Sequence, residues 1–203
     1  MAPCNFWLFV LIPIVIPQHS AAFSKVVSSA AKYVPKKSHP YMFMLNSPMY
    51  LYLTTRGLPG VACIKAIKTT ANLAARTLTQ LLVFKSLRSG YDYEYVHYKP
   101  ICKHKKPVRG FASFNNNTRE KTTYTLRHIY QDCAIVNKTT NTKTGGYREA
   151  CELWVNDQFF GRNLDGLKFC ITNFWNYCKP NDTVKQYLIS YCEEKPGKLI
   201  LVS

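Results

Sequence analysis

From residue 41 onward, short runs of apolar, β-branched and aromatic residues alternate with turn-forming residues. This pattern is typical of short strands joined by turns. The runs are YMFML (41–45), MYLYLTT (49–55), VACIKAIK (61–68), RTLTQLLVFK (76–85), YEYVHY (93–98), RGFASF (109–114), TTYTLRHIY (122–130), CAIVN (133–137) and CELWVN (151–156). They predict about eight strands in a sandwich or an up-and-down barrel, with no repeat and no second domain.

One segment has helical spacing instead. In residues 167–178, LKFCITNFWNYC, the residues Cys170, Phe174 and Cys178 recur every fourth position and so share one stripe of a helix. The two cysteines would lie roughly 12 Å apart on that helix, beyond the reach of a disulfide, so each is expected to bond elsewhere, to the sheet beneath. Residues 186–192, QYLISYC, then predict a last short strand. A barrel of about eight strands leaves room for one small ligand.

The N-terminus has a different pattern. Residues 6–16, FWLFVLIPIVI, are almost wholly apolar, and the small residues Ser20 and Ala22 follow at the spacing that signal peptidase prefers. The apolar run is too short to span a bilayer. We therefore expect a signal peptide over residues 1–22 and a single domain over residues 23–203 of a secreted protein. No later stretch reaches a transmembrane length, so we expect no membrane insertion.

The formal net charge of +16 lies entirely in the expected mature protein, because residues 1–22 contain no Lys, Arg, Asp or Glu. Charge of this size bears on partners rather than on fold. It favours anionic partners such as glycosaminoglycans or acidic proteins, and the basic runs at 32–37 and 103–109 are candidate contacts unless they are merely solvated loops. The aromatic residues follow strand patterns rather than a nucleic-acid-binding motif, so nucleic acid is not an expected partner.

The cysteines fit a secreted protein. One of the eight, Cys4, lies in the expected signal peptide, and seven remain, so at most three disulfides form and one thiol is left over. No two cysteines have CxxC spacing, and none has a histidine at zinc-ligand spacing, so no structural metal site is expected. Three sequons are candidate glycosylation sites: Asn116, Asn137 and Asn181.

Motifs of the common catalytic classes are absent from the sequence. It has no GxSxG elbow, no HExxH pair and no glycine-rich phosphate loop. Most of its cysteines are expected in disulfides and are therefore unavailable as nucleophiles. We accordingly expect a binding protein without a cofactor, and not an enzyme.

The segments YLYLTTRG (50–57), ACIKAIKTTANLAARTLTQLLVFK (62–85), YQDCAIV (130–136), CELWV (151–155) and YLISYC (187–192) resemble the tick salivary lipocalins, the histamine-binding family of blood-feeding ticks. The resemblance covers most of the mature chain. It implies an all-β fold, an eight-stranded antiparallel lipocalin barrel or calyx, with one C-terminal helix packed outside.

The resemblance also implies how the cysteines pair. The implied disulfides are Cys63–Cys192, Cys133–Cys170 and, from the remaining pair, Cys151–Cys178. Each would stabilise the fold by roughly 2–4 kcal/mol. Cys102 is left over, either as a buried free thiol or as a link between two copies of a chain that we expect to be a monomer.

Family members that bind histamine or serotonin carry Cys-Asp-aliphatic, a spacer, Glu-Leu-Trp/Tyr, a second spacer and Cys. The chain keeps the Glu-Leu-Trp half at residues 152–154, but Ala134 stands where the aspartate would be. On a strand, Glu152 and Trp154 share one face, and the resemblance places that face in the calyx. A desolvated ammonium needs compensation, so the loss of one of two carboxylates is expected to weaken an amine site severely. Asp132 stands nearby, but a one-residue step along a strand turns a side chain to the other face.

The alternative for Glu152 and Trp154 is packing, in which the indole fills the barrel and the carboxylate bonds a neighbouring hydroxyl. Tyr124 and Arg127 are further ligand candidates, on opposite faces of one strand. An inward-facing Arg127 could hold the carboxylate of a fatty acid or leukotriene, and a solvated arginine is the alternative. The tyrosine stripe at 91, 93 and 95 could line a pocket or belong to the core or rim.

Two functions follow from these features. The first is a secreted lipocalin that sequesters a small host mediator and so suppresses host inflammation or haemostasis. The mediator would be a biogenic amine such as histamine or serotonin, or a lipid such as a leukotriene. The second is a protein-binding lipocalin that inhibits a host defence protein, for example of complement, through its basic outer surface.

Overall fold

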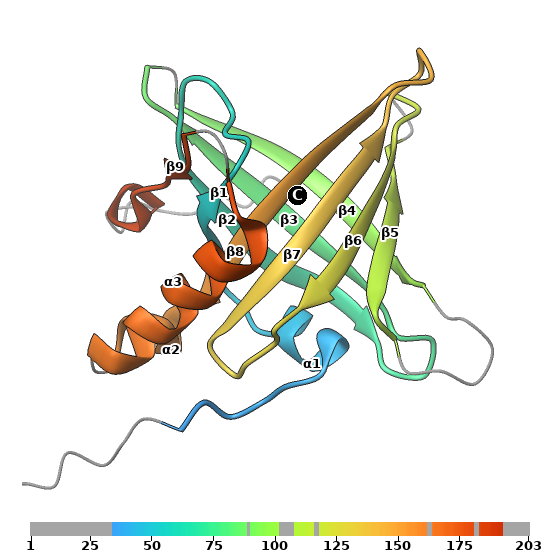
Figure 1. The fold of residues 1–203 in the computed structure, drawn as a ribbon. Helices are drawn as coiled ribbons and strands as arrows, with labels where there is room; N and C mark the ends of the chain where they lie inside the picture. The colour runs from blue at the N-terminus through green and yellow to red at the C-terminus, as the bar shows by residue number, and fades with distance from the viewer. Residues whose placement is uncertain are drawn as a thin grey trace, which may run out of the picture. The chain divides into compact units, whose positions relative to one another are not determined.

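The computed structural model describes residues 34–88, 90–101, 108–115, 118–161, 164–180 and 183–192, and eight of its strands form a closed antiparallel barrel (Figure 1). The strands are β1 (Met49–Thr54), β2 (Val61–Asn72), β3 (Thr77–Ser86), β4 (Tyr91–Pro100), β5 (Gly110–Phe114), β6 (Lys121–Arg127), β7 (Cys133–Asn141) and β8 (Tyr147–Asn156). Strands β2 to β8 pair in chain order, and β1 pairs with both β8 and β2. The predicted barrel is confirmed. The expected signal peptide, Cys102, Asn116, Asn181 and, of the two basic runs, residues 32–33 and 103–107 lie outside the described residues.

The predicted strand at residues 41–45 is wrong, because this run forms the short helix α1 (Pro40–Met44). Proline suits the first turn of a helix, where its missing N–H costs nothing. A short run that is apolar at every position does not by itself distinguish a strand from a buried helix. Helix α1 lies at one end of the barrel (Figure 1), and its buried Tyr41, Phe43 and Met44 pack into the interior cluster.

Strands β7 and β8 present two different faces, because successive side chains on a strand alternate. The inner face of β7 carries Ala134 and Val136, which belong to the interior cluster of the barrel. The outer faces carry Cys133, Ile135, Leu153, and Val155, which belong to a second buried cluster. This second cluster is where the C-terminal helix packs.

Helix α3 (Leu164–Cys178) packs on the outer faces of β7 and β8, as the predicted stripe requires. Phe174 is fully buried in the outer cluster. Disulfides on either side of it, Cys133–Cys170 and Cys151–Cys178, join the helix to β7 and β8. The helix starts after a four-residue helix α2 (Asp157–Phe160), and none of the helices in the described ranges is long and apolar enough to cross a membrane.

The predicted strand at residues 186–192 is replaced by a two-residue strand, β9 (Lys185–Gln186), and a 3₁₀ turn, η1 (Ile189–Cys192). The segment lies where β1 and β2 separate: the Tyr187 N–H donates to Tyr52 and the Leu188 N–H to Ala62. The third disulfide, Cys63–Cys192, anchors its end to β2. All three disulfides therefore have the pairing that the resemblance implied.

Candidate functional site

Glu152 and Trp154 lie on the inner face of β8, as the alternation of that strand predicts. The side chain of Glu152 is only 5% exposed. The indole Nε1 of Trp154 donates a hydrogen bond to Oε2 of Glu152 at 2.8 Å. The indole also packs against both the interior cluster and a smaller cluster around Tyr187. A buried carboxylate is therefore held in place by its neighbour two positions along the strand.

A lysine that the sequence analysis missed faces the same carboxylate. Nζ of Lys138, on β7, lies 3.7 Å from Oε1 of Glu152. The carboxylate raises the pKa of Lys138 above its usual value, and burial opposes this effect. The side chain of Lys138 as a whole is 37% exposed. Alternation from Ala134 through Val136 would have placed Lys138 on the inner face, if the predicted strand had been extended beyond residue 137.

Two tyrosines complete this interior cluster. Tyr124 pairs directly with Lys138 in the register of β6 and β7, and the ammonium lies 5.9 Å from its ring centroid. The rings of Tyr98, on β4, and Tyr124 pack edge to face, with their centroids 5.2 Å apart. Burial is the main cause that raises the pKa of Tyr98 well above its usual 10.0, followed by the neighbouring Tyr124 and Glu152, and burial also raises the pKa of Tyr124. The predicted ligand residue Tyr124 is thus brought together with Glu152 and Trp154, whereas Tyr98 was missed.

Polar groups continue along the inner face beyond this cluster. Glu94, on the same face of β4 as Tyr98, accepts a hydrogen bond from Nδ2 of Asn115 at 2.9 Å. The hydroxyls of Thr122 and Thr140, opposite each other on β6 and β7, lie 3.0 Å apart. The interior therefore combines an apolar lining with a few convergent polar groups, an arrangement that suits an amphipathic small molecule.

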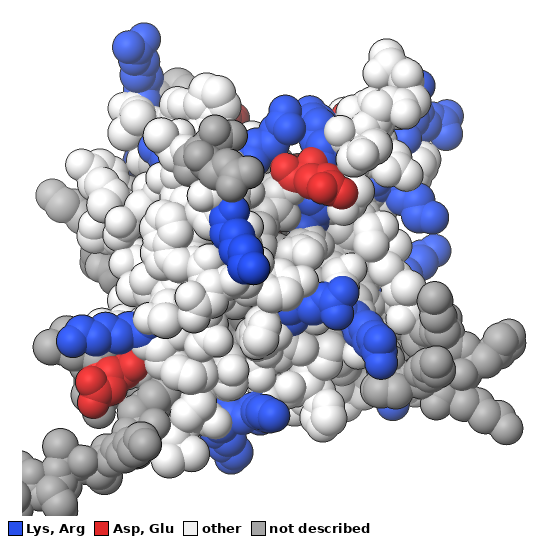
Figure 2. Space-filling view, in the orientation of Figure 1, with Lys and Arg blue, Asp and Glu red and all other residues white. Residues whose placement is uncertain are grey.

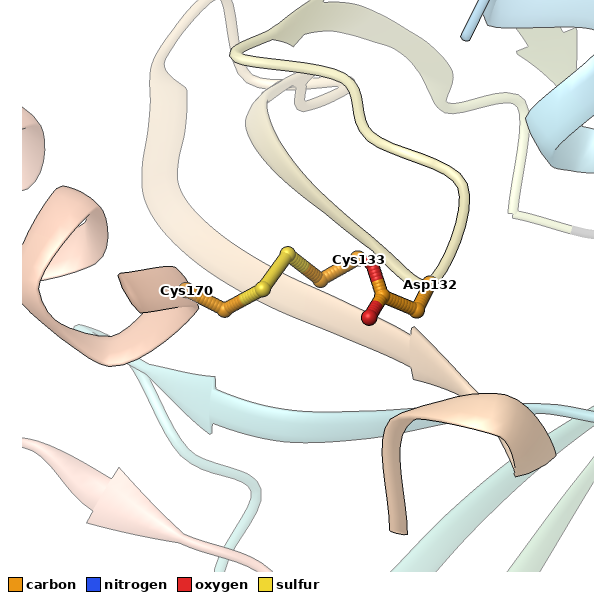
Figure 3. Close-up of side chains that lie close together, drawn as sticks. All are labelled: Asp132, Cys133 and Cys170. Atoms are coloured by element: carbon orange, nitrogen blue, oxygen red, sulfur yellow. A yellow bond between two sulfur atoms is a disulfide. The ribbon is translucent and has the colours of Figure 1, made fainter. Parts of the chain in front are cut away.

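Ala134 lies opposite Trp154 in the register of β7 and β8 and is fully buried. It adds no carboxylate to the cluster. Asp132 does not supply a carboxylate to the cluster either, because it lies beside the Cys133–Cys170 disulfide (Figure 3). A carboxylate oxygen of Asp132 and the sulfur atoms of Cys133 and Cys170 lie within 4.8 Å of one another. Both sulfur atoms are in the disulfide and are unavailable as thiolate ligands for a metal ion.

Arg127 is exposed and lies on the opposite face of β6 from Tyr124, so the structure does not bring it to the cluster. The tyrosine stripe of β4 also faces outward: Tyr93 is 58% and Tyr95 63% exposed, while Nζ of Lys85 lies 3.9 Å from the ring centroid of Tyr91. Neither Arg127 nor the stripe of Tyr91, Tyr93 and Tyr95 therefore faces the interior of the barrel. Figure 2 shows Lys and Arg scattered over one face of the protein, with few acidic side chains among them.

Asn137, a predicted glycosylation site, lies on the outer face of β7 beneath α3. Its Nδ2 donates a hydrogen bond to the hydroxyl of Tyr177 at 3.2 Å, and its Oδ1 lies 3.3 Å from Sγ of Cys151. A glycan would have to be attached to that same nitrogen. Its place under the helix argues against modification of the folded protein.

A surface pocket of about 430 Å³ lies outside the barrel between β1, α2 and the C-terminal segment. Its lining residues are Tyr50, Tyr52, Asp157, Phe160 and residues 186–190. The lining includes none of the interior cluster. Because the convergent polar groups lie inside the barrel, we place the candidate ligand site there rather than in this pocket.

No protein-family model matches this chain, and no curated protein matches it in sequence. Its fold is similar to that of known structures. A bovine odorant-binding protein, a deswapped triple mutant, is 10% identical and has a TM-score of 0.51, with 76% of this chain and 97% of the other covered. The odorant-binding protein OBP1 is 10% identical and has a TM-score of 0.50, with 70% of this chain and 88% of the other covered. AM182, solved as a serotonin complex, is 16% identical and has a TM-score of 0.49, with 80% of this chain and 95% of the other covered. The chain thus has the lipocalin fold.

Proposed function

We propose that this protein is a secreted, tick-type salivary lipocalin that sequesters a small host mediator inside its barrel. The observation that carries the proposal is the interior cluster, in which the carboxylate of Glu152, the ammonium of Lys138, the indole of Trp154 and the phenol of Tyr124 converge. Ligand sites typically combine such a small set of polar groups with an apolar lining. The three disulfides, paired as the resemblance implied, also support it.

Sequestration requires no chemistry. A rigid barrel with its polar groups already positioned loses little conformational freedom when a ligand binds. Abundant secreted protein would then lower the free concentration of a mediator at a bite, be it a biogenic amine or a lipid. The cluster supplies donors and an acceptor for one polar end of such a molecule, and the surrounding apolar residues contact the rest.

Native mass spectrometry tests this proposal on protein secreted from eukaryotic cells. The protein is offered histamine, serotonin and a leukotriene together, and the mass of any adduct identifies the class. We expect one adduct per chain, reduced by Trp154→Ala and, where the ligand is an amine, by Glu152→Gln, in protein that remains folded. Trp175→Ala, which truncates an exposed tryptophan on α3, is the control and should leave occupancy unchanged. Bare protein with every compound, or an adduct that both interior variants retain, would contradict the proposal.

The protein-binding alternative has one specific observation in its favour. Tyr93 and Tyr95 are large, exposed and adjacent on the outer face of β4. Tyrosines are enriched in protein interfaces, where the ring packs and the hydroxyl stays polar. This alternative predicts a salt-sensitive association with a plasma protein that survives Glu152→Gln and is lost in Tyr93→Ser/Tyr95→Ser, as measured by pulldown from serum.

A further inference from the structure

The interior cluster already contains a cation. The ammonium of Lys138 lies 3.7 Å from a carboxylate oxygen of Glu152 and 5.9 Å from the ring centroid of Tyr124. A carboxylate and an aromatic face are the two groups that an organic ammonium ion would seek in a protein. The side chain of Lys138 therefore stands where the charged end of an amine ligand would have to bind.

Both oxygens of Glu152 are engaged. Oε2 accepts from the indole of Trp154, and Oε1 faces Lys138. Elsewhere on the inner face, Oε1 of Glu94 accepts from Asn115. Ala134, directly opposite Trp154, contributes no charge. An incoming amine would thus compete with Lys138 for the carboxylate of Glu152.

That competition favours the lysine. Its ammonium is covalently tethered to β7, so its effective concentration at Glu152 is high and independent of dilution. An amine would also have to lose its own hydration on entering the barrel. Displaced from Glu152, the lysine would leave a second positive charge in the same interior, which costs further electrostatic energy.

The same lysine suits another class of ligand. An ammonium group has three N–H donors, so Lys138 can face Glu152 and still donate to an oxygen atom of a ligand. The hydrophobic core against which Tyr124 and Trp154 pack is apolar and includes Leu82, Val96 and Val136. An amphiphile with a carbonyl, hydroxyl or carboxylate end would satisfy the ammonium without displacing it.

We propose that Lys138 is the specificity-determining residue of the calyx: its ammonium fills the cation position beside Glu152, excludes organic ammonium ions and leaves the barrel to amphiphiles without a positive charge. This inference rests on the proposed function, since it assumes that the barrel interior is the ligand site. It narrows the mediator from an amine or a lipid to the lipid class.

The test is calorimetric titration of the full mature protein with serotonin and, separately, with palmitate. Lys138→Met removes the ammonium but keeps an unbranched apolar side chain, and Lys138→Gln is measured beside it so that the result does not depend on the folding of one variant. Lys138→Arg keeps the cation. Lys143→Met, in the exposed turn between β7 and β8, makes the same change in net charge away from the cluster.

We expect the wild type, Lys138→Arg and Lys143→Met to bind palmitate and to bind serotonin weakly or not at all. Lys138→Met and Lys138→Gln should bind serotonin at least tenfold more tightly than the wild type does, about 1.4 kcal/mol. Adding Glu152→Gln to Lys138→Met should abolish that gain, because the carboxylate is then absent.

Two results would overturn the inference: a wild type that binds serotonin as tightly as Lys138→Met does, or folded Lys138→Met and Lys138→Gln that gain no serotonin affinity.

Failure of the proposed function gives a different set of binding results. If the wild type binds neither probe but Lys138→Met gains serotonin, Lys138 is the block and sequestration by the wild type fails. If the wild type binds palmitate and neither variant gains serotonin, sequestration stands and the role of Lys138 fails. If no form binds either probe, both fail.

Discussion

The two faces of β7 and β8 differ in chemistry although their residues alternate along the same strands. The outer face is apolar and is joined to α3 by Cys133–Cys170 and Cys151–Cys178. The inner face carries the charged pair of Lys138 and Glu152. Residues one position apart therefore differ in their surroundings: the outer ones pack against α3, and the inner ones form the proposed ligand site.

The comparison explains how a polar group is tolerated inside the barrel. A buried carboxylate is costly unless hydrogen bonds and an opposite charge compensate it. Glu152 has both, from Trp154 and Lys138. Since the helix and the disulfides restrain the same strands from outside, these partners stay in position before any ligand arrives, which reduces the ordering cost of binding.

The largest expected effect is on the outer face. Phe174→Ala removes a fully buried ring between α3 and the sheet. It should lower the free energy of unfolding in urea by about 3–5 kcal/mol. Its half-exposed neighbour on the helix, Trp175, packs edge to face against the Phe174 ring and is the control, and Trp175→Ala should lower stability by only about 1 kcal/mol. Equal losses in the two variants would mean that the outer layer does not hold the barrel wall.

The next effect is on the inner face and is smaller. Glu152→Ala leaves the indole N–H of Trp154 without its acceptor and Lys138 without its counter-charge. We expect a loss of about 1–2 kcal/mol, mostly from the indole, since solvent screens the partly exposed lysine. Glu152→Gln keeps an acceptor for the indole and should cost less. Urea unfolding that gives the same loss for both substitutions would show that the indole hydrogen bond contributes nothing.

A third effect depends on pH. The raised pKa of Tyr98 means that the folded protein keeps this proton at pH values where the unfolded chain loses it. The contribution is fully present below the unfolded pKa of about 10 and is lost as pH rises toward the folded value. Urea unfolding between about pH 8 and about pH 11 should therefore show a falling free energy of unfolding, with a shallower slope in Tyr98→Phe. Tyr124→Phe should also make this slope shallower, but by less than Tyr98→Phe does. A slope that is unchanged in both variants would refute the burial of these phenols.

The last prediction concerns glycosylation of Asn137, where we expect no effect. Asn137 has its Nδ2 bonded to Tyr177 beneath α3, so we expect no glycan there. Glycopeptide mapping of secreted protein should find the residue unmodified, and Thr139→Ala, which destroys its sequon, should not change the glycan mass. A glycan on Asn137 would require the helix to pack differently from the structure.

Much of the barrel could be predicted from alternation and turn residues, and the stripe of Cys170, Phe174 and Cys178 predicted the packing of α3. Alternation also placed Glu152 and Trp154 on a common face. It could not tell which face of β4 points inward, because a strand pattern is unchanged when the faces are exchanged. On β4, Tyr93 and Tyr95 therefore proved to lie outside the barrel and Tyr98 inside it.

Lys138 was missed for a related reason. Its partner Glu152 lies on the next strand, and only the register, in which Val136 is opposite Glu152, brings the ammonium to the carboxylate. The polar sequence NKTTN resembles a loop, although it continues β7. The short helix α1 was missed because its apolar run is as compatible with a strand as with a helix.

The central claim is that a ligand binds beside Trp154, inside the barrel. The chain has three tryptophans, and only Trp154 and Trp175 lie in residues 23–203, so Trp175→Phe leaves the interior indole as the sole tryptophan reporter there. We would titrate this variant with palmitate and follow its fluorescence. We expect a saturable change in emission with one ligand per chain, and no change in Trp154→Phe, which keeps only the exposed indole. Palmitate that changes the emission of Trp175 but not that of Trp154 would place the ligand outside the barrel and would contradict a site beside Trp154.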